Sequence, residues 1–187
     1  MRIAVPTEPD PSETRVGATP ETVKKYTALG AEVAVQAGAG MKSGITDADY
    51  QSAGATIAPD ASATIAGADI VLRVKRPAGN ELAGAKPGAA VIAIMDPYGN
   101  DDAIADIGRR GVTAFAMELM PRITRAQVMD VLSSQANLAG YRAVIDGAAE
   151  YGRAIPMMMT AAGTIPAARI FIMGVGKVLA PAPPRYR

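Results

Sequence analysis

The sequence of 187 residues contains neither cysteine nor histidine. Without cysteine, disulfide bonds and thiolate chemistry are excluded, and the compartment is not revealed. Without histidine, the chain lacks the most common general base at neutral pH, the Ser–His pair of many hydrolases and the ligand of nearly all zinc sites. We therefore expect no metal site and a function that needs no histidine.

Aromatic residues and net charge are also scarce. Aromatics make up 4% of the chain and tryptophan is absent, so a hydrophobic fraction of 49% must build its core from Ala, Val, Ile, Leu and Met. A net charge of +1 argues against nucleic acid or an anionic membrane as the main partner. The longest apolar runs, such as 89–95, are far shorter than the roughly 20 residues that cross a bilayer. The N-terminus lacks the apolar region of a signal peptide, so we expect a soluble, cytoplasmic protein.

The first 118 residues alternate short apolar runs with helical segments. Thr19 and Pro20 form a typical helix start, and Gly30 a typical helix end. Further helices are expected at 46–53, near 60–66 and in DDAIADIGRR. Strands are expected at 2–5, 32–36, 55–58, 69–75, 89–95 and 112–118. This order predicts an α/β fold with a Rossmann-like, doubly wound parallel sheet.

The stretch from Met120 to Gly152 predicts the longest helix, over 125–152, with Thr124 and Gln127 at the spacing of a capping box. At about 100° per residue, uncharged polar residues and one carboxylate share a narrow arc. Such a face suits a polar ligand, although on spacing alone a plain interdomain helix with a solvated side is the more common explanation. The arc contains Gln127, Asp130, Ser134, Asn137 and Tyr141, and the face expected to pack contains Val128, Val131, Leu132, Leu138 and Ala139.

The sequence after this helix predicts the start of a second Rossmann-like domain at 153–176. Residues 156–167 are predicted as a connector and 168–176 as a strand that ends in Gly174, Val175 and Gly176. A dinucleotide-binding turn would place a third glycine where this chain has Leu179, and would continue into a helix. Residues 177–187 are an aberrant, proline-rich tail that cannot form that helix.

Four segments together resemble a known family. They are RIAVPTE with ETRVGATPETV, VLRVKRP, AMELMPRITRAQVMD with LSSQANLAGYRAVIDGA, and MMMTAAGTIPAARIFIMGVG. The sequence resembles the alanine dehydrogenase and nicotinamide nucleotide transhydrogenase superfamily over residues 1–176. Within it the match is to the NAD(H)-binding alpha subunits of proton-translocating NAD(P) transhydrogenases. The resemblance implies an N-terminal α/β domain at 1–118, a loop and long interdomain helix at 119–152, and a cofactor cleft between two domains.

The resemblance also implies a reaction and partners. Hydride would pass from NADH on this subunit to NADP+ on a partner subunit, coupled to proton translocation and regenerating NADPH. The implied assembly is a homodimer of alpha subunits, attached to the cytoplasmic face of the inner membrane through NADP-binding and membrane-spanning subunits. Direct transfer between two nicotinamides needs proximity, orientation and exclusion of water, and no histidine or cysteine.

By the same resemblance, residues of the loop and long helix bind the nicotinamide end of NAD(H). Gln127 and Asp130 would have the catalytic role of orienting the ring. The first three positions of the pyrophosphate turn would follow the predicted strand. The implied cofactor-binding residues are Arg122, Ile123, Gln127, Asp130, Ser133, Gly174, Val175 and Gly176.

Two alternatives remain open at this point. Arg15 and Lys75 match positions that hold the substrate in alanine dehydrogenases, although both can be ordinary surface charges. That chemistry also needs a histidine after Met95, where this chain has Asp96. The other alternative is a truncated, non-catalytic fragment that keeps only dimer or partner contacts, and the 187-residue chain would then be inactive and bind NADH weakly or not at all.

Overall fold

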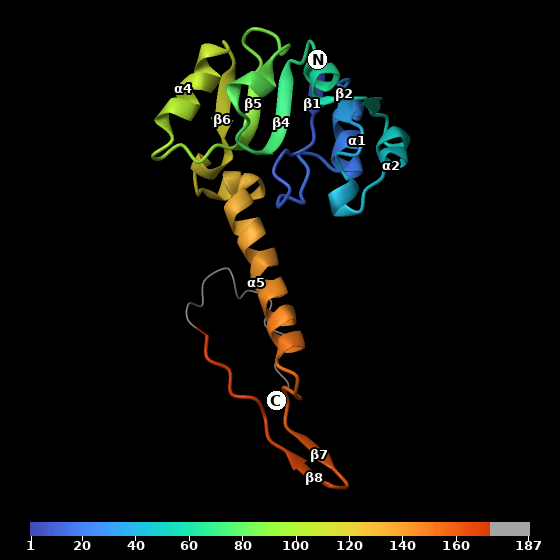
Figure 1. Ribbon diagram of the computed structural model, residues 1–187, viewed down its shortest axis with the longest axis vertical. Coiled ribbons are helices and arrows are strands. Elements are labelled where there is room, and N and C mark those ends of the chain that lie inside the picture. The colour runs from blue at the N-terminus through green and yellow to red at the C-terminus, as the bar shows by residue number, and fades with distance from the viewer. Residues whose placement is uncertain (173–187) are drawn as a thin grey trace. The chain divides into compact units, whose positions relative to one another are not determined.

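The computed structural model describes residues 1–172 and divides the chain into two compact units (Figure 1). The first unit spans Met1–Pro121, and the second begins at Arg122. Each unit is described by itself below.

The first unit is built on a six-stranded sheet with the order β3-β2-β1-β4-β5-β6. All neighbouring strands run parallel. The strand order reverses between β1 and β4, which is the topological switch point of a doubly wound sheet. The predicted Rossmann-like α/β fold is confirmed for this unit. The strands are β1 Arg2–Val5, β2 Glu32–Gln36, β3 Thr56–Ala58, β4 Ile70–Lys75, β5 Ala90–Ile94 and β6 Thr113–Ala116.

Two helices of the first unit, α1 and α2, begin at threonine caps that the sequence predicts. Thr19 caps the first helix by accepting a hydrogen bond from the Thr22 amide, and Thr46 and Asp49 form a reciprocal capping box. Gly30 ends the first helix with a φ of 82°, a conformation that glycine adopts at little cost. The helices are α1 Pro20–Ala28, α2 Asp47–Ser52, α3 Ala61–Ile65 and α4 Asp101–Arg109, with 3-10 turns η1 Met41–Ser43, η2 Gly79–Leu82 and η3 Met117–Leu119.

The core of this unit lies on both faces of the sheet. Alternate residues of a strand point to opposite faces, so Ile3 and Val5 enter one cluster while Ala4 enters the other. Tyr50 fills the first cluster, and its buried hydroxyl donates to the carbonyl of Ala18 at 2.8 Å. Ile107 of α4 packs in the second cluster. Coverage of both faces explains why the strands read as continuous apolar runs.

The second unit contains η4 (Thr124–Met129), α5 (Val131–Glu150) and a hairpin of β7 (Met158–Thr160) and β8 (Gly163–Ile165). The prediction of one helix over 125–152 is therefore wrong at its start. Asp130 has a ψ of 87°, which interrupts the helical path, and it is the residue that caps α5. The predicted capping box is also wrong, because η4 follows Ile123 without any side-chain cap. An aspartate at the N-cap is a stronger start signal, and its charge suits the helix N-terminus.

This break changes the predicted faces of the long helix. Gln127 lies in the 3-10 turn, so it does not share a continuous helical arc with Ser134, Asn137 and Tyr141. The face expected to pack is also wrong in this unit, because Val128, Leu132 and Leu138 are 93%, 40% and 61% exposed. Of the predicted polar arc, only Ser134, Asn137 and Tyr141 lie within α5 and can share one helical face.

The segment 156–167 is more ordered than the connector that the sequence predicted. β7 and β8 pair antiparallel, with Met158 opposite Ile165. The predicted strand 168–176 is wrong over its described part, because 168–172 has no strand conformation. The described strands belong to the six-stranded sheet and to this hairpin, and residues 168–172 pair with neither. Gly174, Val175, Gly176 and Leu179 lie outside the described residues.

Within residues 1–172, no helix combines the length and the apolar character needed to cross a bilayer. The longest helix, α5, carries an exposed ion pair between Arg142 and Asp146.

Candidate functional site

The candidate cofactor site centres on the start of α5. The Asp130 carboxylate accepts hydrogen bonds from the Ser133 amide, at 2.9 Å, and from the Ser133 hydroxyl. Its main-chain carbonyl accepts a bond from the Ser134 amide at 3.2 Å. These bonds fix the side-chain orientation of Asp130, and both Asp130 and Ser133 are half-buried. The sequence-predicted pair is therefore brought together in the structure.

The turn before α5 places the other predicted residues. The Ala126 amide donates to the carbonyl of Ile123 at 2.9 Å, and the Asp130 amide donates to the carbonyl of Gln127 at 3.2 Å. Ala126 is the buried residue of this turn, whereas Arg122, Ile123 and Gln127 are exposed. Arg122 and Ile123 precede the turn, so they lie at its entrance and not on α5.

The polar side chains around Asp130 are suited to bind a carboxamide on a ring and the hydroxyls of a ribose. Gln127 offers an amide, Arg122 a guanidinium and Ser133 a hydroxyl, so donors and acceptors are both present. The Asp130 carboxylate gives the stronger, charge-assisted hydrogen bonds. The donor set therefore fits the nicotinamide end of NAD(H).

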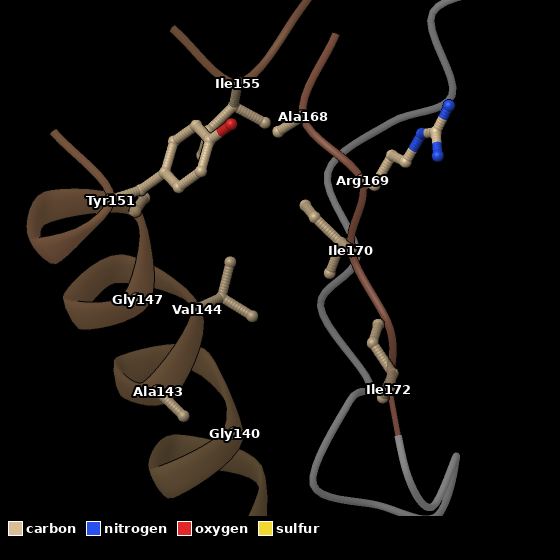
Figure 2. Close-up of a pocket in the computed structure, with 11 residues that line it drawn as sticks. Gly140, Ala143, Val144, Gly147, Tyr151, Ile155, Ala168, Arg169, Ile170 and Ile172 are labelled. Atoms are coloured by element: carbon tan, nitrogen blue, oxygen red, sulfur yellow. The ribbon is translucent and has the colours of Figure 1, made fainter. Parts of the chain in front are cut away.

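A separate cavity of about 310 Å³ lies between α5 and residues 168–172 of the same unit (Figure 2). Its helix side is a small-residue face that includes Gly140 and Gly147, and its other side includes Ile170 and Ile172. In Figure 2 the side chain of Arg169 extends from this segment on the side away from the helix. The lining is mostly apolar, with Tyr151 and Arg169 as its polar members, so this cavity offers mainly packing contacts. The sequence reasoning missed this face of α5.

A second polar cluster occupies the carboxyl ends of β1 and β4 in the first unit. The Glu8 carboxylate accepts bonds from Arg73 Nε at 3.2 Å and from the Val74 amide at 2.7 Å. The Glu8 and Arg73 side chains are only 2% and 3% exposed. The pair lies where the β4–β5 register shifts between Leu72 and Lys75. Sequence reasoning missed it, although an arginine inside the apolar run of β4 signals a buried partner.

The exposed side of this cluster contains Arg15 and Lys75. Lys75 Nζ lies 2.6 Å from an Asp10 carboxylate oxygen and 3.9 Å from Glu13. Arg15 makes two bonds of 2.7 Å to Glu13. The hydrogen bond from Lys75 holds the pKa of Asp10 well below its usual range, and the bonds from Arg15 lower the pKa of Glu13. The hydrogen bond to Asp10 raises the pKa of Lys75, so both cations are engaged with acids of the same chain.

The loop after β5 contains the position at which alanine dehydrogenase chemistry needs a histidine. Asp96 occupies it with a φ of 44°, an uncommon conformation for a residue other than glycine. Arg76 donates to the carbonyls of Met95 and Asp96, and Glu118 accepts from the amides of the same two residues. The loop is held by these bonds, and Asp96 itself is exposed.

Residues 4–139 match the family described as alanine dehydrogenase/PNT, N-terminal domain. The chain belongs to the alanine dehydrogenase/PNT family. It is 52% identical over 181 residues to the first part of the NAD(P) transhydrogenase alpha subunit of Rhodospirillum rubrum, covering 94% of this chain and 47% of that relative. The resemblance to transhydrogenase alpha subunits is therefore confirmed.

Two further relatives are similar to this chain. The crystal structure of transhydrogenase from Sinorhizobium meliloti is 57% identical with a TM-score of 0.90, covering 95% of this chain and 53% of that chain. The alanine dehydrogenase of Mycobacterium tuberculosis is 35% identical over 151 residues, covering 79% of this chain and 39% of the relative. The chain thus spans about half the length of the R. rubrum and S. meliloti transhydrogenase relatives. Its matches to both have a higher identity and cover more of the chain than its match to the alanine dehydrogenase.

Proposed function

We propose that this chain serves as the N-terminal, NAD(H)-binding part of the alpha subunit of a proton-translocating NAD(P) transhydrogenase. The observation that carries the proposal is the 52% identity to the R. rubrum transhydrogenase alpha subunit across 94% of the chain. That aligned length includes the turn and helix start that hold the polar group around Asp130.

The chain's own residues would orient the nicotinamide end of the cofactor, which supplies the hydride when bound. Asp130, held by Ser133, would accept hydrogen bonds from the carboxamide. Gln127 and Arg122 would fix the ring and ribose from the preceding turn, and Ile123 would supply an apolar contact. Gly174, Val175 and Gly176 would receive the pyrophosphate through their amides. Orientation of two nicotinamides is the main requirement of direct hydride transfer, so the absence of histidine is no obstacle.

The proposal includes an assembly. The alpha subunit would form a homodimer and would work with an NADP(H)-binding subunit and with membrane-spanning subunits that carry the proton. The names of the R. rubrum and Rickettsia prowazekii relatives describe the first part of an alpha subunit, which supports a divided subunit. The attachment to the cytoplasmic face of the inner membrane would then come from those partners.

An alanine-dehydrogenase-like function is the second candidate, because the M. tuberculosis relative is 35% identical. The structure disfavours it on two observations. Lys75 and Arg15 are paired with Asp10 and Glu13, and the position after β5 holds an exposed Asp96. Amine oxidation passes through an imine and needs proton transfers at the substrate, and this chain has no histidine to carry them.

A full-length chimera tests the proposal. Residues 1–172 of this chain are joined to the remaining half of the R. rubrum relative and combined with the partner subunits. Reduction of NADP+ by NADH, without NAD+ reduction by L-alanine, is the expected result. NAD+ reduction by L-alanine with no transhydrogenation would support the second candidate, and the absence of both in a folded chimera would favour a non-catalytic module.

A further inference from the structure

One side chain joins the loop after β5 to the end of the first unit. Glu118 lies in η3, directly after β6, and its carboxylate accepts hydrogen bonds from the main-chain amides of Met95, at 3.1 Å, and Asp96. Arg76, directly after β4, donates to the carbonyls of the same two residues. Met95 and Asp96 are therefore held by charged side chains from two other segments of the first unit, and such bonds are the stronger kind.

The loop held in this way has a strained backbone. Asp96 has a φ of 44°, and among residues 1–172 it is the one residue other than glycine with a positive φ. Such a conformation costs energy and persists where the surrounding contacts fix it. The Asp96 carbonyl also accepts a bond from the Asn100 side chain at 2.9 Å. The strain, and the number of bonds that hold it, point to a role for this loop beyond the connection of β5 to α4.

The position of Glu118 in the chain indicates that role. Two residues separate Glu118 from Pro121, the last residue of the first unit. Within this short link, the Met120 amide donates to the carbonyl of Met117 at 3.3 Å. Pro121 has a fixed φ and confines Met120 to extended backbone, in agreement with the ψ of 129° at Met120. The link is short and stiff, so a displacement of η3 is passed on to Arg122, where the second unit begins.

We propose that Glu118 is a positioning residue for the cofactor site: by holding the loop after β5, its carboxylate fixes the chain at its exit from the first unit and so the approach to Arg122. Glu118 acts through the chain and needs no contact with the cofactor. Without its carboxylate, the loop and η3 move independently, and the group around Asp130 reaches the orientation for hydride transfer less often. The local part of this proposal concerns the first unit alone, whereas the effect on hydride transfer rests on the proposed function.

Amide hydrogen exchange in the whole 187-residue chain tests the local part. Glu118→Ala removes the acceptor of the Met95 and Asp96 amides, so both should exchange about fivefold to tenfold faster, the equivalent of one lost hydrogen bond each. The Met120 amide should accelerate with them, because its bond closes the turn that Glu118 holds in place. Unchanged exchange at Met120 overturns the proposal, since the loop and the exit of the first unit would then be independent.

Glu81→Ala is the matched control. Glu81 is half-buried like Glu118, and it accepts a hydrogen bond from the Ala78 amide at 2.7 Å in another 3-10 turn of the first unit, η2. Its loss should accelerate exchange at Ala78 and leave the exchange of the loop amides and of Met120 unchanged. Equal acceleration at Met120 in both variants would be a general loss of stability and would overturn the proposal.

Single-turnover hydride transfer in the full-length chimera tests the effect on the reaction. Glu118→Ala should lower the rate constant about fivefold or more while the Kd for NADH changes by less than about twofold. Glu118→Gln keeps one acceptor oxygen and should give an intermediate rate constant. Partial unfolding lowers the amplitude and not the rate constant, so the two effects are separated.

An unaltered rate constant in Glu118→Ala overturns the positioning role. An inactive unaltered chimera contradicts the proposed function instead, and the exchange experiment then decides the role of Glu118 by itself.

Discussion

The Asp130 carboxylate caps α5 by accepting a hydrogen bond from the Ser133 amide at 2.9 Å. The same two residues belong to the group proposed to bind the nicotinamide end of NAD(H). One interaction therefore starts the helix and also fixes a ligand-binding side chain. The consequence is that the structural and functional roles of Asp130 must be separated by the choice of substitution.

Asp130→Ala should destabilise the first turn of α5, because the loss of an N-cap side chain costs about 1 kcal/mol. Amide hydrogen exchange at Ser133 and Ser134 should accelerate. Asp130→Asn should preserve most of the protection, since asparagine is an equally good cap. Asp146→Ala is the control, because within residues 1–172 the Asp146 side chain pairs with Arg142 at an exposed position. Unchanged exchange at Ser133 in Asp130→Ala would show that the cap contributes nothing.

Glu8→Ala should strongly destabilise the first unit. The substitution removes the nearer carboxylate of the buried Arg73, which keeps only the 3.8 Å contact to Glu81 among the described ion pairs, and it frees the Val74 amide. The loss of one partner of a buried pair costs about 3–5 kcal/mol. Urea unfolding followed by circular dichroism measures this loss in the free energy of unfolding. Glu21→Ala, which removes an exposed pair with Lys25, should unfold at nearly the same urea concentration as the unaltered chain. Similar midpoints for both variants would contradict the structural role of the pair.

The pH dependence of stability should contain a contribution from Glu13. Its pKa is lowered from 4.5 in the folded state, mainly by hydrogen bonds from Arg15. A group with a lowered folded pKa stabilises the protein above its unfolded pKa, and this contribution is lost as the pH falls through the folded value. The free energy of unfolding should therefore fall more steeply from about pH 5 to about pH 3 in the unaltered chain than in Glu13→Gln. Parallel curves for the two proteins would show that the Arg15 contact is absent in solution.

The 187-residue chain by itself should bind NADH weakly or not at all. It spans about half the length of the R. rubrum relative, and Leu179 stands where the dinucleotide-binding turn has its third glycine. Isothermal titration with NADH should show no saturable binding, whereas the full-length chimera should bind. Micromolar binding by the 187-residue chain would mean that the nicotinamide-end residues suffice without a complete pyrophosphate site.

Much of the first unit could be predicted from sequence because its signals are local. The apolar run of β5 and the Thr19 and Thr46 caps specify their elements without long-range information. The start of α5 was harder, because Thr124 with Gln127 and Asp130 with Ser133 both have the spacing of a helix cap. The structure uses Asp130, whose carboxylate bonds the Ser133 amide, and the competing signal six residues earlier becomes a 3-10 turn.

The missed features depend on residues distant in sequence. Glu8 and Arg73 are 65 positions apart, and no local pattern joins them. The β7–β8 hairpin has strands of three residues each, which is too short for a clear periodic signal. The candidate site was predictable at Asp130 and Ser133 because a resemblance named the residues. Their hydrogen bond follows from a helix cap that the sequence reasoning had placed elsewhere.

The most direct test of the transhydrogenase proposal is single-turnover hydride transfer in the full-length chimera with its partner subunits. Asp130→Asn keeps the helix cap but removes the charge proposed to orient the ring, and Asp146→Asn is the control. We predict that Asp130→Asn lowers the rate constant by about tenfold or more while the Kd for NADH changes by less than about twofold. Gln127→Ala should behave in the same way. Hydride transfer at the unaltered rate in Asp130→Asn would contradict the account.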